Sequence, residues 1–253
     1  MRHPVFHALG QLLARYLSHP RPGAQTGMPT NRHALAQCLR PGDVLLVEGN
    51  SRFSTAIKYL TQSTWSHAAF FVGPQLGGAD AQGQPYLLIE ADILQGVCKR
   101  PLEHYLPYPT RICRPIGLNA ADLQRLLMEI TSKLGEQYDL KNVFDLARYL
   151  LPAPPVPGRW RRHLLALGSG DPTRAICSSL IAEAFQSVAY PILPAITLDR
   201  HQDPKRHQAV TEEIFHIRDR SLYAPRDFDV SPYFEIVKPT LEMGFDYHHI
   251  HWA

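Results

Sequence analysis

The sequence lacks several features that would place it in a familiar class. Its four cysteines, Cys38, Cys98, Cys113 and Cys177, lie far apart and include no C-x-x-C pair. This spacing favours neither a zinc ribbon nor a small disulfide scaffold. No run approaches the roughly eighteen uninterrupted apolar residues that a membrane-spanning helix needs. The N-terminal residues lack the small-residue cleavage site of a secretory signal, so we expect a cytoplasmic protein.

Charge of either sign is also scarce. Charged residues make up 19% of the 253 residues, and 26 Lys and Arg against 23 Asp and Glu give a formal net charge of +3. The cations are scattered along the chain, so we expect no nucleic-acid partner, which would require a concentrated basic surface. The hydrophobic fraction of 45% is enough to bury the core of one large domain, which excludes a wholly disordered chain.

Composition divides the chain into three parts. Residues 1–18 place apolar side chains at helical spacing, which predicts an amphipathic helix. This helix either docks on its own domain or makes peripheral contact with a membrane. Residues 19–34 are dense in Pro, Gly and polar residues and predict a linker. Residues 35–253 form the main domain, with a Pro-rich excursion at residues 152–172.

Strand-like and helix-like patterns both occur in the main domain, which predicts an α+β fold. The segments at 66–72 and 86–92 are apolar runs that we expect to pair as a hairpin with a long connection. Beyond Pro194 the chain is predicted to be irregular, with an extended return at 223–237. The other predicted strands are 44–47 and 111–114, and the predicted helices are one starting near Ser51, one at 120–134 capped by Asn119, one at 140–151 and one starting near Ile176.

Cys177 is the one cysteine that falls in the first turn of a predicted helix. The free N–H groups and the positive end of the helix dipole stabilise a thiolate there, which favours a nucleophilic role. The same position also fits an inert thiol in the core. The other three cysteines lie in or beside predicted strands or just before a Pro-Gly turn, and we interpret them as small hydrophobic residues.

His67 is the candidate base for such a nucleophile. It opens a mostly apolar strand, where a histidine is either catalytic or a core residue with a satisfied hydrogen bond. Glu90 lies in the next apolar strand, and a half-buried carboxylate needs a partner. If the two strands pair, Glu90 can reach the His67 imidazole and orient it, as in a catalytic triad. Alternatively, Glu90 forms a salt bridge with Arg111 or Lys99.

Five short motifs follow one another in the chain: PGD at 41–43, WSH at 65–67, IEA at 89–91, Gly135 to Tyr138-Asp139, and ICSSL at 176–180. Their order resembles that of the permuted NlpC/P60 cysteine hydrolases, the YiiX/YebB-like group of the papain-like superfamily. The resemblance covers approximately residues 38 to 235. The histidine strand precedes the cysteine helix, which is typical of the circularly permuted branch of that superfamily.

The resemblance implies a circularly permuted papain-like fold, in which an antiparallel sheet or small barrel packs against the nucleophile-bearing helix. It implies Cys177 as nucleophile, His67 as general base and then acid, and Glu90 as the orienting residue. The expected activity is thiol-dependent hydrolysis of an amide or ester bond, without cofactor or metal. The expected substrate is a small amide, ester, peptide or lipid, of the cell-wall or lipid-derived kind.

Three other functions remain open at this point. An acyltransferase resembling lecithin-retinol acyltransferase would use the same thioester but pass the acyl group to an acceptor other than water. A non-catalytic peptide- or lipid-binding module would require an unreactive Cys177. His249 and His251 alternate on one side of an extended tail and raise a metal site as a third option, although no H-E-x-x-H helix or thiolate pair accompanies them.

Overall fold

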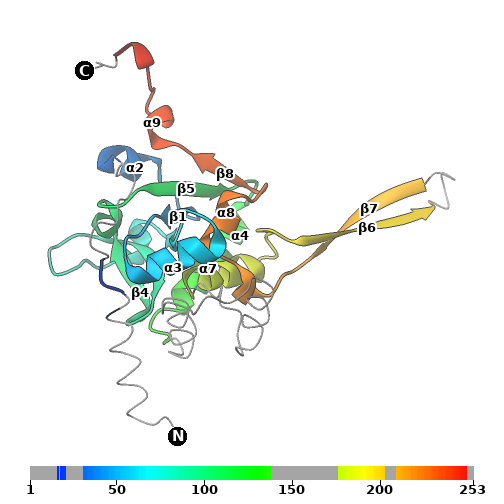
Figure 1. Ribbon diagram of the computed structural model, residues 1–253, viewed down its shortest axis with the longest axis horizontal. Helices are drawn as coiled ribbons and strands as arrows, with labels where there is room; N and C mark the ends of the chain where they lie inside the picture. The colour runs from blue at the N-terminus through cyan, green and yellow to red at the C-terminus, as the bar shows by residue number, and fades with distance from the viewer. Residues whose placement is uncertain (1–15, 17, 21–30, 138–175, 203–208, 250–253) are drawn as a thin grey trace, which may run out of the picture.

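A six-stranded antiparallel sheet forms the centre of the protein (Figure 1). The structure is a computed structural model that describes residues 16, 18–20, 31–137, 176–202 and 209–249. The strand order is β4-β3-β2-β1-β5-β8. The bounds are β1 (Val44–Val47), β2 (His67–Phe71), β3 (Tyr86–Asp92), β4 (Gly96–Pro101), β5 (Thr110–Pro115) and β8 (Phe234–Val237).

The strands that the sequence predicts lie in this sheet. β1 and β3 have the predicted bounds, β2 is shorter by one residue at each end, and β5 is longer by one at each end. β2 and β3 pair antiparallel through Phe70 and Ile89, as expected for the hairpin. Together with its helices, the sheet gives the mixed α and β architecture that the alternating patterns predict.

Helix α7 (Ile176–Ser187) and helix α4 (Ala120–Ser132) pack together, and α7 lies on β2 and β3. Side chains alternate across β2, so that Ala68 and Phe70 join the apolar cluster that includes α7, whereas Ala69 and Phe71 join a second cluster on the opposite face. Phe185 of α7 is fully buried, and its ring contacts Phe70 at a centroid distance of 6.1 Å.

Capping side chains set where two predicted helices begin. The Ser51 hydroxyl accepts a hydrogen bond from the Ser54 backbone N–H at 3.0 Å and starts α3 (Arg52–Thr61). The Asn119 side chain accepts from the Asp122 N–H at 2.8 Å and starts α4. Gly135, just beyond the predicted helix at 120–134, has φ +87°, a left-handed conformation that glycine adopts without steric cost.

Some elements differ from the sequence predictions. β4 was not expected, and a protruding hairpin of β6 (Ala195–Gln202) and β7 (Ala209–His216) occupies a stretch predicted to be irregular, so that prediction was wrong (Figure 1). Both elements carry charged residues within short strands, which hides the alternation that marks a half-buried strand. Helix α2 (Arg32–Cys38) takes in the last three residues of the predicted linker at 19–34, because Ala34 and Leu35 are buried against the core.

Several predicted features lie outside the described residues. They are most of the helix at 1–18, the helix at 140–151, Tyr138 and Asp139, the Pro-rich excursion at 152–172, and His251. Within the described parts of the chain, no helix is both long and apolar enough to cross a membrane. The remaining short elements are η1 (Pro74–Leu76), η2 (Leu102–Tyr105), η3 (Arg220–Leu222), α8 (Pro225–Asp229), α9 (Pro239–Glu242) and η4 (Tyr247–His249).

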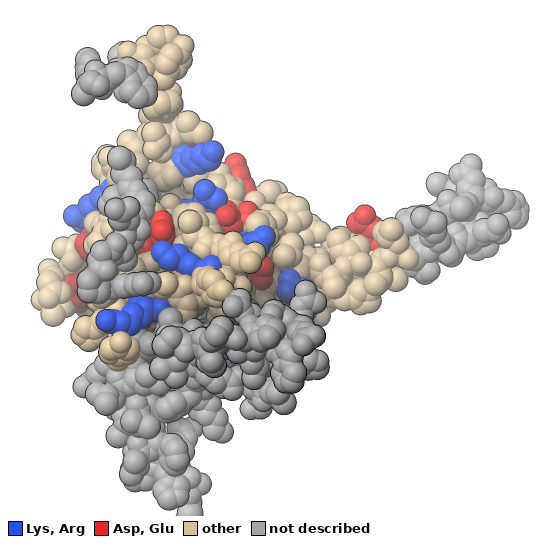
Figure 2. All heavy atoms as spheres, in the orientation of Figure 1, with Lys and Arg blue, Asp and Glu red and all other residues tan. Residues whose placement is uncertain are grey.

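Lys and Arg side chains are interspersed with Asp and Glu on the face of the molecule that Figure 2 shows. Charged side chains also form a buried ion pair. Arg114 holds the buried Asp43 carboxylate through Nε at 2.9 Å and Nη2 at 2.8 Å. Asp43, the last residue of the PGD motif, also accepts from the Arg40 backbone N–H at 2.8 Å. It therefore links the turn before β1 to strand β5.

Candidate active site

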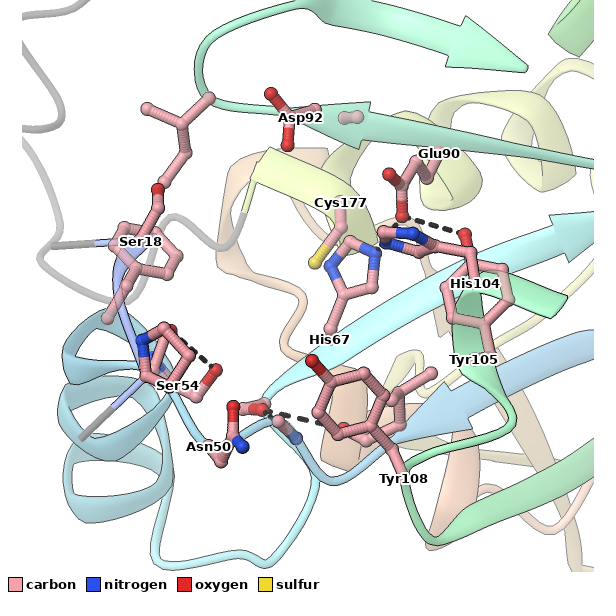
Figure 3. Close-up of a pocket in the computed structure, with 18 residues that line it drawn as sticks. Ser18, Asn50, Ser54, His67, Glu90, Asp92, His104, Tyr105, Tyr108 and Cys177 are labelled. Atoms are coloured by element: carbon pink, nitrogen blue, oxygen red, sulfur yellow. Dashed lines mark hydrogen bonds and ion pairs between the residues drawn. The ribbon is translucent and has the colours of Figure 1, made fainter. Parts of the chain in front are cut away.

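Cys177 is the second residue of α7, and its side chain is largely buried. Its sulfur points toward the His67 imidazole (Figure 3). The first backbone N–H groups of a helix have no partner within the helix, and the Cys177 N–H is one of these groups. The first turn of α7 therefore carries both the thiol and a backbone N–H donor on the same residue.

His67 is the first residue of β2, where the backbone is fixed by a hydrogen bond from the Ser66 N–H to the Val47 carbonyl at 3.1 Å. By strand alternation its side chain belongs to the sheet face opposite α7. Because it sits at the end of the strand, its ring still reaches the N-terminus of α7 and lies beside the Cys177 sulfur, with which it interacts (Figure 3). The imidazole is 26% exposed, so it is accessible from one side.

Glu90 lies on β3 beside His67, and its carboxylate is only 3% exposed. Oε2 is 2.5 Å from His67 Nε2 and 2.7 Å from the Tyr105 hydroxyl, and Oε1 accepts from Arg100 Nε at 2.5 Å. An ionised carboxylate only accepts hydrogen bonds, so His67 donates through Nε2. The Nδ1 atom is then left to face Cys177. The structure thus brings the three residues singled out in the sequence into one chain of contacts.

The alternative partners considered for Glu90 are engaged elsewhere. Lys99 Nζ donates to the Leu76 carbonyl at 2.8 Å, and Arg111 Nη1 donates to Asp229 Oδ1 at 2.7 Å. The predicted salt bridge from Glu90 to either residue was therefore wrong. The reason is β-strand geometry, because Arg100 on β4 rather than Lys99 projects on the same sheet face as Glu90.

The charges of this cluster shift the pKa values of His67 and Glu90 in opposite directions. Burial lowers the pKa of His67, but its interactions with the Cys177 and Glu90 side chains outweigh burial and raise that pKa well above 6.5. Burial would raise the pKa of Glu90, yet His67, Arg100 and Tyr105 hold it well below its usual range. The site thus favours a protonated imidazole beside an ionised Glu90.

Arg100 and Tyr105 complete the surroundings of Glu90, and sequence reasoning did not find them. Tyr105 is buried, and burial together with the Glu90 charge raises the pKa of its hydroxyl, which stays protonated and donates. Burial lowers the pKa of Arg100, but interactions with its neighbours, Glu90 first among them, outweigh burial and raise that pKa. The guanidinium therefore stays charged. The sequence did signal that a buried glutamate needs hydrogen-bond donors. Because strand β4 was not predicted, however, no donor residue could be placed beside Glu90.

The three residues border a cavity of about 270 Å³ (Figure 3). Its wall combines apolar and polar side chains. Those include Phe53, Ile93, Asn50, Asp92, His104 and Tyr108. Two residues of the N-terminal segment, Ser18 and Pro20, also border this cavity. A concave site that contains a perturbed histidine is the usual setting of enzyme chemistry.

The other cysteines have unreactive surroundings. Burial raises the pKa of Cys98 to about 12, and burial also raises the pKa values of Cys113 and Cys38. A protonated thiol is a poor nucleophile. Among the residues that the structure describes, none of the His, Cys, Asp and Glu side chains form a group of three or more that could hold a metal ion.

Comparison with solved structures gives distant structural neighbours, and the metalloprotein YiiX is one of them. No family model matches the sequence, and no curated protein matches it. The crystal structure of the metalloprotein YiiX from Escherichia coli O157:H7, described as DUF1105, is similar with a TM-score of 0.44 and 17% sequence identity. The alignment covers 79% of this chain and 96% of that chain.

Proposed function

We propose that this protein is a thiol hydrolase that cleaves an amide or ester bond through a thioester on Cys177. The observation that carries the proposal is the chain of contacts from Cys177 through His67 to Glu90 at the edge of a cavity. A nucleophile, a base and a third group that orients the base are the minimal set for this chemistry. The raised pKa of His67 favours the thiolate and imidazolium form of the pair.

In the first half of the reaction the Cys177 thiolate attacks the carbonyl carbon and forms a C–S bond. The negative charge moves to the carbonyl oxygen, and the Cys177 backbone N–H at the start of α7 is placed to donate to it. The tetrahedral intermediate collapses, and the C–N or C–O bond breaks. Protonated His67 gives its proton to the leaving nitrogen or oxygen, which departs as an amine or alcohol.

In the second half a water molecule attacks the thioester. His67, now neutral, accepts a proton from this water, and the C–S bond breaks to return the Cys177 thiolate and a carboxylic acid. Glu90 holds the Nε2–H and stabilises the charge that forms on the ring in each half. Its bonds to Arg100 and Tyr105 keep it ionised without solvent.

Selective alkylation tests the proposal. The full-length protein is treated with iodoacetamide at neutral pH, and the rate at each cysteine is followed by peptide mass spectrometry. We expect Cys177 to react much faster than Cys38, Cys98 and Cys113, because only its thiolate is paired with an imidazolium. Cys177→Ala removes the fast reaction.

His67→Ala is expected to slow alkylation of Cys177 severalfold, whereas His33→Ala, an exposed histidine on α2, leaves the rate unchanged. Equal rates at Cys38 and Cys177, or a His67→Ala variant as reactive as the native protein, would overturn the proposal. p-Nitrophenyl acetate then separates hydrolysis from acyl transfer, because only an acyltransferase passes the acetyl group to an added amine in preference to water.

A further inference from the structure

Tyr16 and residues 18–20, together called segment Tyr16–Pro20, reach the start of α3 from far away in the sequence. Pro20 pairs with Ser51 in an isolated antiparallel bridge, and the Arg52 backbone N–H donates to the His19 carbonyl at 3.4 Å. Arg52 also contacts Tyr16, with Nη1 at 3.4 Å from its carbonyl oxygen and the guanidinium carbon 4.4 Å from its ring centroid. One arginine therefore anchors the segment by its backbone and its side chain.

This anchor holds the segment against the cavity that contains Cys177. Ser18 and Pro20 line the same cavity as Cys177, His67 and Glu90. In Figure 3, Ser18 lies on the side of the cavity opposite Glu90 and His104, with Cys177 between them. The cavity therefore has one wall from the β3 and η2 side and another wall from the N-terminal segment and α3.

The cavity is small for a substrate site. Its volume of about 270 Å³ lies just below the range of roughly 300–1,000 Å³ that is usual for small-molecule sites. The contacts that Arg52 makes with this wall are weak, because Tyr16 is 58% exposed and both Arg52 hydrogen bonds are long. A wall of this kind limits what fits, and a substitution in its anchor can loosen it while the catalytic contacts stay intact.

We propose that segment Tyr16–Pro20 is a specificity-determining wall of the Cys177 site, and that it restricts the substrate to one with a compact acyl group. This inference rests on the thiol chemistry proposed above and names the kind of substrate that the site takes. The wall excludes groups by their size, so it slows the reaction of Cys177 with bulky electrophiles and does not change the reaction with compact ones. Its anchor, Arg52, does not contact the reacting atoms.

Two reagents with the same reactive group and different sizes test this proposal. Iodoacetamide is compact, and 5-iodoacetamidofluorescein carries a bulky dye on the same iodoacetamide reactive group. The rate of each at Cys177 is measured in the full-length protein by peptide mass spectrometry. The rate of each reagent at Cys177 is divided by its rate with free cysteine. In the native protein we expect this ratio to be much lower for the fluorescein reagent than for iodoacetamide.

The double variant Tyr16→Ala/Arg52→Ala loosens the wall. We expect its rate with the fluorescein reagent to rise severalfold, while its rate with iodoacetamide stays within twofold of the native value. Arg125→Ala is the matched control, because Arg125 is also an exposed arginine on a helix but contacts Asp122 instead. Ser18→Trp adds bulk to the same wall and is expected to slow the fluorescein reagent further.

The outcomes separate the two proposals. Fast iodoacetamide alkylation with an unchanged size preference in the double variant and in Ser18→Trp overturns the wall and leaves the thiol chemistry standing. Slow iodoacetamide alkylation of Cys177 in every variant, the native protein included, overturns the thiol chemistry and the wall with it. A loosened size preference in Arg125→Ala as well would also count against a role specific to Tyr16–Pro20.

Discussion

Glu90 shows how a buried charge is stabilised in this protein. A carboxylate taken out of water loses much of its solvation, and only good hydrogen bonds and opposite charges offset that cost. Glu90 has three donors within 2.7 Å, from His67, Arg100 and Tyr105. They hold it ionised, and it in turn holds His67 in one orientation and one tautomer. The protonation states of the site therefore depend on each other.

Glu90→Gln removes the charge and keeps an acceptor of similar shape. Because the Glu90 charge raises the pKa of His67, we expect that pKa to fall in the variant. The imidazolium is then lost at lower pH, and cleavage that needs a proton donor declines at lower pH as well. NMR titration of the His67 ring measures the change directly. An unchanged His67 pKa would show that Cys177 alone sets it.

The same substitution predicts a change in acid stability. The folded protein holds the pKa of Glu90 well below the ordinary value of 4.5, so its contribution to stability is present above that pH and is lost as the pH falls. We expect the free energy of unfolding of Glu90→Gln to depend less on pH below about 5 than that of the native protein. Urea unfolding at a series of pH values measures this. Parallel curves would contradict it.

Arg100→Leu leaves Glu90 with a smaller compensating charge while keeping much of the side-chain volume. Removing one partner of a buried ion pair is strongly destabilising, so we expect the free energy of unfolding to fall by about 3 kcal/mol. Arg125→Leu removes an exposed arginine from an ion pair and should cost less than about 1 kcal/mol. Urea unfolding at pH 7 compares the two, and similar losses would argue against a structural role for the Arg100 contact.

At the scale of elements, the position of Cys177 depends on how α7 packs. Apolar side chains of this helix face the sheet, and Phe185 lies among the rings of Phe70, Phe228 and Phe234. These contacts fix the rotation and height of the helix. They therefore place the thiol, in the first turn of the helix, at the end of β2, where His67 begins the strand.

Phe185→Ala tests this dependence. Loss of a fully buried phenylalanine leaves a cavity, so we expect the free energy of unfolding to fall by about 4 kcal/mol. Because α7 then packs less firmly, we also expect slower iodoacetamide alkylation of Cys177. Met128→Ala, an exposed apolar residue on α4, is the control and should change neither quantity appreciably. Denaturant unfolding and the alkylation assay measure the two effects. Full reactivity at lowered stability would mean that the contacts of Phe185 do not position the thiol.

At the scale of the whole molecule, the β6–β7 hairpin extends away from the six-stranded sheet (Figure 1). Ile196, Leu198 and Phe215 are exposed on it. A two-stranded ribbon with little cover is only marginally stable in water. The molecule therefore combines a well-packed sheet and helix body with an arm whose backbone hydrogen bonds are easily reached by solvent.

Hydrogen exchange is expected to show this contrast. Amides of β6 and β7 should exchange much faster than those of β1 and β2, because the central strands are buried and paired on both sides. Exchange followed by mass spectrometry on the purified protein at micromolar concentration measures the difference. Equal protection in the hairpin and the central strands would contradict this picture.

The sequence was sufficient for the parts in which local pattern and burial agree. β1, β3, the caps of α3 and α4, and Cys177 in the first turn of a helix follow from short-range rules. β4 and the β6–β7 hairpin do not, because their strands carry charged residues and little continuous apolar sequence. Arg100 was missed with β4, although a buried glutamate signalled that some donor was needed.

The sequence by itself determined the chemistry of the candidate groups, a thiol at a helix start, a histidine opening a strand and a carboxylate among apolar residues. Only the tertiary structure decided which of them meet. His67 belongs to the sheet face opposite α7 and reaches Cys177 only from the end of its strand. The contact of Ser18 and Pro20 with the cavity likewise joins segments far apart in the chain. Such long-range contacts depend on the packing of the whole fold, which no local pattern contains.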